Sequence, residues 1–228
     1  MTSDPLIIGC WMLVWLFSVT VHETAHGWTA WRLGDSTAYH GGQAAFDPLP
    51  HMMREPIGMV IVPLISIIFF GYPMGWASVP IDPEWMQRNP RFSAVVSMAG
   101  PLANLIIVIV AGVLLKLGLS YDVFEVVRAS KLVDLMTAPE AGLALFAVKM
   151  LSMLLIINII LFGFNLLPFP PLDGSAIPLF FLSNDEANTY FSYIYHPTFQ
   201  MVGMLAVWYL SPYVLSPLIR FVFMLVIT

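Results

Sequence analysis

Charged residues are scarce in this sequence. Asp, Glu, Lys and Arg make up only 10% of its 228 residues, whereas 59% are hydrophobic and the mean hydropathy is +0.83. Soluble domains carry about 25% charged residues, so a chain this poor in charge cannot cover a globular surface with water-seeking groups. The composition therefore predicts an integral membrane protein that contacts the lipid bilayer. A net charge of −5 gives no reason to expect nucleic acid among its partners.

Cysteine is almost absent as well. The single Cys10 lies inside an apolar run, which excludes a disulfide framework and a cysteine-based zinc site and leaves a small packing residue as its expected role. The N-terminal residues MTSDP also lack the basic region of a signal peptide. We therefore expect the first apolar segment to be retained.

Five apolar segments divide the chain. Crossing about 30 Å of hydrocarbon takes roughly 20 helical residues, and the first, third and fourth segments are long enough. The last segment contains Pro212 and Pro217, so it is expected to form one kinked span or two short ones. The connections between segments are too short for a soluble domain, which predicts one membrane-embedded unit over residues 1–228. The segments cover about residues 6–33, 57–70, 92–117, 141–165 and 200–227.

The second segment, IGMVIVPLISIIFF, is only fourteen residues long and runs directly into Gly71, Tyr72 and Pro73. Glycine and proline break a helix, and irregular backbone at membrane depth is tolerated only where protein or water surrounds it. We therefore expect a re-entrant hairpin over residues 57–79. The predicted fold is an all-α polytopic membrane protein with a three-helix core, this hairpin, and one or two C-terminal membrane helices.

An H-E-x-x-H pattern, His22 to His26, stands near the end of the first apolar segment. Residues four apart lie on one face of a helix, so both imidazoles can bind one metal ion, and Glu23 can reach water beside that ion. The alternative is a pair of core histidines that hydrogen-bond to neighbouring helices. Ionisable groups inside a membrane span are costly and usually mark a functional site, which favours the metal site.

Two histidines leave the site incomplete, because catalytic zinc usually takes three protein ligands. Asp173 has the most informative setting of the candidates, in GFNLLPFPPLDGSAI after the fourth segment. The prolines there cannot continue a helix, and Gly174 permits a tight turn directly after the carboxylate. The alternative is a solvated aspartate at a proline-rich helix exit. The candidates for the third ligand are His40, His51, His196, Asp47, Asp82, Asp173 and Asp185.

Three motifs together, H-E-x-x-H, NLLPFPPLDG and MAGPLANL (residues 98–105), closely resemble the site-2 protease family of intramembrane zinc metalloproteases. The stretches RLGDSTA and DPLPH resemble its compact branch, which lacks a PDZ or CBS domain. By this resemblance His22, His26 and Asp173 are the ligands of one Zn²⁺ per chain, and Glu23 is the catalytic base. Asn104 is expected near the cleft, where its amide would hold a substrate carbonyl or a loop.

The resemblance also implies an activity and a location. The expected reaction is hydrolysis of a peptide bond within or near the transmembrane segment of a membrane protein substrate. The expected location is a prokaryotic cell membrane, with the active site toward the cytoplasm. Because a helical substrate must unwind before cleavage, the stretch GYPMGWASVP (residues 71–80) is a candidate gate or a strand-like edge for the substrate. A filler between helices is the alternative.

A ligand set shared between the first segment and the stretch after the fourth one constrains the topology. If Asp173 meets the histidines, the fourth segment must end on the membrane face where the first one ends, and the third must begin there. Residues 57–70 then make no net crossing, so they must enter and return.

Two other functions remain open at this stage. A membrane zinc carrier or sensor would use the same ligands but would have little need of Glu23, and a scaffolding membrane protein would bind no metal.

Overall fold

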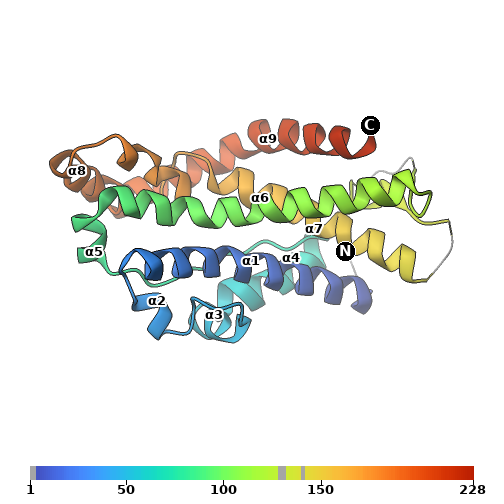
Figure 1. The fold of residues 1–228 in the computed structure, drawn as a ribbon, viewed down its shortest axis with the longest axis horizontal. Coiled ribbons are helices and arrows are strands. Elements are labelled where there is room, and N and C mark those ends of the chain that lie inside the picture. The colour runs from blue at the N-terminus through green and yellow to red at the C-terminus, as the bar shows by residue number, and fades with distance from the viewer. Residues whose placement is uncertain (1–3, 128–131, 140–141) are drawn as a thin grey trace.

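The structure is a computed structural model that describes residues 4–127, 132–139 and 142–228. Within these residues, four helices are long and apolar enough to cross a membrane, and they lie side by side along the long axis of the molecule (Figure 1). They are α1 (Pro5–Leu33), α6 (Pro90–Ser120), α7 (Leu143–Asn165) and α9 (Pro197–Ile227). The predicted all-α polytopic membrane fold is confirmed.

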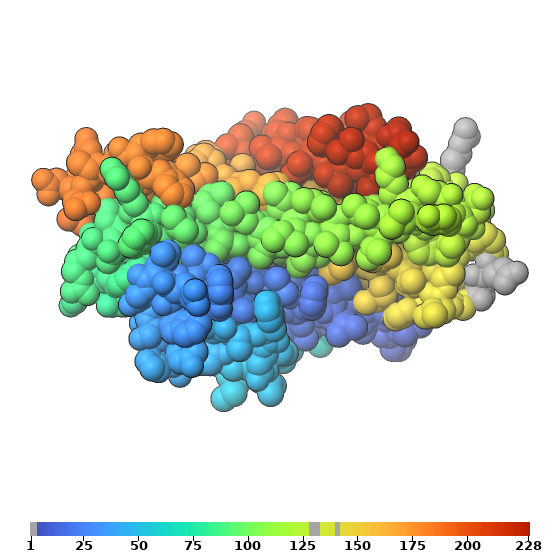
Figure 2. Space-filling model, in the orientation of Figure 1, coloured from blue at the N-terminus to red at the C-terminus, as the bar shows by residue number. Residues whose placement is uncertain are grey.

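The observed helices sharpen two of the predicted segments. The C-terminal segment forms one continuous helix that contains Pro212 and Pro217, rather than two short spans. The first described residue of α7 is Leu143, and the predicted start at Ala141 lies outside the described residues. In the space-filling view, α6 forms a band between the N-terminal elements α1–α3 and the C-terminal helix α9 (Figure 2).

Short elements connect the long helices. Three of the helices begin at an Asp-Pro pair, in which the aspartate caps the helix and the proline occupies its first turn. The side chains of Asp4, Asp47 and Asp82 each accept a hydrogen bond of 2.9 Å from the backbone N–H two residues on. The short helices are α2 (Thr37–His40), α3 (Pro48–Arg54), the π-helical turn η1 (Ile57–Ile61), α4 (Val62–Phe70), α5 (Pro83–Arg88), the 3₁₀ turns η2 (Leu132–Asp134) and η3 (Asp173–Phe180), and α8 (Asn184–Ile194).

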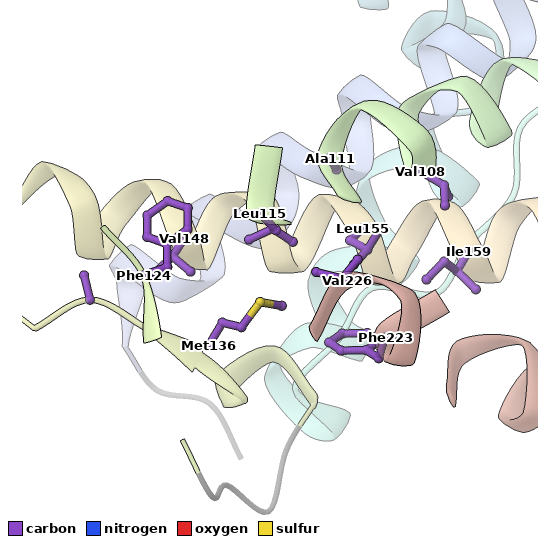
Figure 3. Packing of buried hydrophobic residues seen from close by; sticks show 11 residues of the cluster. Val108, Ala111, Leu115, Phe124, Met136, Val148, Leu155, Ile159, Phe223 and Val226 are labelled. Carbon is purple, nitrogen blue, oxygen red and sulfur yellow. The ribbon is translucent and has the colours of Figure 1, made fainter. Parts of the chain in front are cut away.

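An apolar cluster holds α6, α7 and α9 together at the end where α6 finishes (Figure 3). Ala111 and Leu115 of α6 pack there against Leu155 of α7 and against Phe223 and Val226 of α9. A two-residue antiparallel pair, β1 (Glu125–Val126) with β2 (Met136–Thr137), closes this end. The cluster fixes how α6 is rotated about its axis relative to α7. This rotation places Asn104 of α6 next to Asn158 of α7.

Residues 57–82 enter and return, as the topology requires. The helix η1–α4 leaves α3 at an angle of 110° and ends at Gly71, which has φ of 85°. The chain then runs back beside the helix, because the N–H of Trp76 donates to the carbonyl of Gly58 at 3.2 Å. The N–H of Asp82 finally donates to Asp35, just after the end of α1, at 2.8 Å. The segment is therefore a hairpin that turns back beside its own helix, and its re-entrance into a membrane stays a prediction.

Packing of this hairpin depends on a close approach at Gly58. A Cβ atom added to Gly58 would collide with the backbone carbonyl of Trp76 and come within 2.8 Å of its indole ring. The indole N–H of Trp15 in α1 donates to the carbonyl of Met59 at 3.1 Å, which ties the hairpin to the first helix.

We therefore expect Gly58→Ala to destabilise the hairpin by about 1–3 kcal/mol, as overpacking of a filled site does. The variant should show a lower melting temperature in detergent and faster proteolysis within residues 71–82. Gly9→Ala in α1 is the matched control, because a Cβ there meets nothing within 4 Å. Equal stability of the two variants would contradict the packing described for the hairpin.

Candidate metal centre

His22 and His26 lie one turn apart on α1 and face the same side. Their Nε2 atoms are 3.0 Å apart, and both rings are buried. The preceding apolar residues of α1 place this turn inside the bundle, where α6 and η3 cover it.

Asp173 reaches this pair from η3, eight residues after the end of α7. Its Oδ2 atom lies 3.1 Å from Nε2 of His22 and 3.3 Å from Nε2 of His26. Since the prolines after Asn165 end the helix, the chain is free to turn back. Gly174 makes this turn possible, because a Cβ at that position would collide with the backbone carbonyls of Leu166 and Leu167.

The hydrogen bonds on the far side of each ring show where the protons are. Nδ1 of His26 lies 2.7 Å from the backbone carbonyl of Val96, and Nδ1 of His22 lies 2.6 Å from Oδ1 of Asn104. Both partners are acceptors, so each Nδ1 carries the proton and each Nε2 presents a lone pair. Oδ2 of Asp173 is accordingly buried without a hydrogen-bond donor in the part of the chain that the structure describes.

Three lone pairs that converge in a buried site need a cation between them. Ligands about 2.0–2.1 Å from a tetrahedral zinc ion lie roughly 3.3–3.4 Å apart, close to the separations found here. A carboxylate with two imidazoles is also a ligand set that catalytic zinc uses. Among the described residues, these three form the one group of potential metal ligands, with all ligand atoms within 4.8 Å of one another. The site therefore fits Zn²⁺.

Gly100 of α6 lies directly against the two histidine rings. A Cβ at this position would collide with Nε2 of His26 and lie 2.6–2.7 Å from the ring of His22. Any side chain here would occupy the space that an ion needs. Gly100 belongs to the MAGPLANL motif, but the motif alone gives no sign of this role.

Glu23 lies beside the ligands rather than among them. It follows His22 by one residue and so projects roughly 100° further around α1. It is buried, and its carboxylate has no hydrogen-bond partner among the described residues. No protein donor therefore occupies the lone pairs that a general base needs.

Asn104 lies behind His22, with no exposed surface. Its Oδ1 accepts from His22, and its Nδ2 donates to Oδ1 of Asn158 at 2.7 Å. Both polar ends of the Asn104 amide are thus bonded to other protein groups. The substrate contact predicted for Asn104 stays a prediction. The carbonyl of Val96 and the amide of Asn158 are further contributors that the sequence pattern did not indicate.

The other candidates for a third ligand have other surroundings. Asp47 and Asp82 cap α3 and α5, and His196 caps α9 by accepting from the N–H of Thr198. His51 is buried beside Thr24, with its Nε2 atom 3.5 Å from the hydroxyl. His40 ends α2, and Asp185 lies in the first turn of α8.

A cavity of about 160 Å³ reaches Asp173 from the side of α5 and α8. Its lining includes the polar residues Ser93, Ser97, Ser175 and Gln200. Pro101 has no N–H, so the carbonyl of Ser97 also lacks its usual donor in the helix. The cavity is thus a mainly apolar approach to a buried centre, with a few polar groups along it.

We expect Gly100→Ala to abolish zinc binding while the protein still folds, because the added methyl group takes the place of the ion. Zinc per chain, measured on purified protein, should fall from one to near zero. Gly112→Ala in the same helix is the control, since the nearest atom to its added Cβ is a side-chain methyl at 3.4 Å. A full zinc content in Gly100→Ala would show that the ion lies elsewhere.

Known proteins that are similar to this chain carry the name of zinc metalloproteases. The chain is 34% identical over 175 residues to "Putative zinc metalloprotease YwhC" of Bacillus subtilis, an alignment that covers 76% of this chain and 69% of that one. It is 31% identical over 179 residues to "Putative zinc metalloprotease Rip2" of Mycobacterium tuberculosis, with 77% of this chain and 60% of that one covered. The Rip2 protein of Mycolicibacterium smegmatis is 29% identical, with 76% and 59% covered.

No solved structure matches the chain. The model of peptidase family M50, however, matches residues 11–210, from the first half of α1 into α9. This range contains the H-E-x-x-H helix, Gly100, Asn104 and Asp173, and it confirms the predicted membership of the site-2 protease family. The chain therefore belongs to peptidase family M50.

Proposed function

We propose that this chain is an intramembrane zinc endopeptidase, which hydrolyses a peptide bond within or near the transmembrane segment of a membrane protein. The observation that carries the proposal is the convergence of Asp173 with His22 and His26, between helices long enough to span a membrane. Membership of family M50 and the zinc metalloprotease names of its relatives support a metalloprotease. The prediction that the active-site end faces the cytoplasm of a prokaryotic cell rests on the family resemblance.

In this proposal His22, His26 and Asp173 hold the zinc ion. A zinc ion bound there would act as a Lewis acid, which would acidify water and polarise the scissile carbonyl. Glu23 accepts the proton of the attacking water and later returns it to the leaving amine, as a general base and then a general acid. The bonds of His22 to Asn104 and of His26 to Val96 keep both rings in the tautomer that coordination needs.

The side of α1 that bears Glu23 has a defined covering. Val19 and Ala30 lie near the same side, four residues before and seven after. Val19 shares an apolar cluster with Met59 and Ile67 of the hairpin, and Ala30 shares one with Trp85 of α5. The return arm of the hairpin, residues 73–82, connects the cluster around Val19 with the cluster around Ala30. It therefore passes Glu23, which lies between them on α1.

This return arm can supply an edge for an unwound substrate. Residues 73–82 form no helix or strand, and the N–H groups of Ala77, Ser78 and Val79 donate to no protein acceptor in the described parts of the chain. An extended edge with unpaired backbone groups pairs readily with another extended segment. A substrate strand held there would place its carbonyls beside Glu23. This arrangement favours a substrate edge over a mere filler between helices.

A zinc carrier or sensor is the competing function, and Glu23 separates the two. We expect Glu23→Gln to keep one zinc per chain and to lower cleavage of a single-span test substrate at least about 100-fold, the usual contribution of a general base. The assay uses purified protein in detergent or liposomes, with a chelator added in parallel to remove zinc. Cleavage should also cease with the chelator and return with added zinc.

Glu84→Gln is the matched control for this experiment, because it makes the same chemical change at an exposed residue of α5. Cleavage should be unchanged in this variant. Undiminished cleavage by Glu23→Gln would end the protease proposal, whereas zinc loading without cleavage of any test substrate by the wild type would favour a carrier.

A further inference from the structure

Asn158 is a polar residue in the middle of α7 with no exposed surface. A buried amide in a membrane helix is costly unless all of its polar atoms are paired. The sequence suggests only interhelical bonding for it. Its actual partners connect three helices and end at a ligand of the proposed metal centre.

The amide of Asn158 is fully engaged. Its Nδ2 donates to the backbone carbonyl of Leu154 and to the hydroxyl of Ser18, both at 2.8 Å. Its Oδ1 accepts from Nδ2 of Asn104 at 2.7 Å, and Oδ1 of Asn104 in turn accepts from Nδ1 of His22 at 2.6 Å. A continuous chain of hydrogen bonds therefore runs from α7 through α6 to α1.

The carbonyl of Leu154 sets the direction of this chain, and a longer bond of 3.4 Å from Nδ2 of Asn104 to the carbonyl of Ser18 agrees with it. The carbonyl of Leu154 only accepts, so the NH₂ group of Asn158 must face it and the oxygen of Asn158 must face Asn104. That oxygen also only accepts, so Asn104 must turn its NH₂ group toward Asn158 and its oxygen toward His22. His22 then has to carry its proton on Nδ1 and leave Nε2 free.

We propose that Asn158 is a positioning residue, which fixes the tautomer of His22 by holding the amide of Asn104 in one orientation. This inference rests on the proposed function in one respect, that His22 is a zinc ligand. Without Asn158, the Asn104 amide keeps only the long 3.4 Å bond to the carbonyl of Ser18. It can then turn over and present its NH₂ group to His22, which favours the tautomer with the proton on Nε2 and opposes coordination. Residues behind metal ligands typically contribute 10–100-fold to metal affinity.

The first test measures zinc affinity by competition with a fluorescent chelator in the purified full chain. Asn158→Leu has nearly the same volume and no hydrogen-bonding group, and it should weaken zinc binding about tenfold. Ser152→Ala is the matched control in the same helix, because the Ser152 hydroxyl is equally buried and has no hydrogen-bond partner among the described residues. The melting temperature of each zinc-free variant shows whether the fold is retained.

A double-mutant cycle then separates positioning from helix packing. Asn104→Asp puts a carboxylate at this position, which presents an accepting oxygen to His22 whichever way it turns. We expect Asn158→Leu to cost about tenfold in zinc affinity in the wild-type background and nothing in the Asn104→Asp background. A purely structural role for Asn158 would cost the same in both backgrounds, and this result would overturn the proposal.

His22→Ala distinguishes the failure of this inference from failure of the proposed site. Loss of zinc in His22→Ala, together with unchanged affinity in Asn158→Leu, would leave the metal centre intact and reject the positioning role alone. Unchanged zinc affinity in His22→Ala would reject both.

Discussion

The meeting of one carboxylate with two imidazoles, 3.1 and 3.3 Å away, is the contact on which the rest of the structure depends. Three lone pairs repel one another strongly where little water screens them. They are compatible with a stable bundle only if a cation joins them and if donors and acceptors behind them fix their orientation. The protein provides this second requirement with groups from α6 and α7, namely the carbonyl of Val96 and the amides of Asn104 and Asn158.

The same contact dictates the topology. Asp173 follows α7, and the histidines lie toward the end of α1, so both helices must finish at the same end of the molecule. Val96 lies near the beginning of α6, which places that beginning at the same end again. The residues between α1 and α6 therefore cannot cross the bundle, and the hairpin at residues 57–82 is the solution that the chain adopts. Its return arm then passes the side of α1 that bears Glu23.

Much of this arrangement follows from local sequence patterns. Helical periodicity alone predicts that the two histidines of H-E-x-x-H share one face. The prolines before Asp173 predict the end of the helix, because they lack an N–H, and Gly71 with Pro73 predicts the turn of the hairpin. The two prolines in the last segment did not indicate whether it would form one kinked span or two short ones. It continues as one helix, since membrane helices tolerate proline where neighbouring groups satisfy the freed carbonyls.

Other parts of the site have no local signature, for a physical reason. Gly100 is required because two rings from another helix approach its backbone, and nothing in its own neighbours along the chain reports that approach. Every residue has a backbone carbonyl, so the role of the Val96 carbonyl depends on its position alone. Asn158 acquires its role from the direction of a hydrogen-bond chain, which starts at a carbonyl of its own helix and ends on α1. A motif can thus name the ligands of this centre, but the groups that set their protonation become visible only when three helices are packed together.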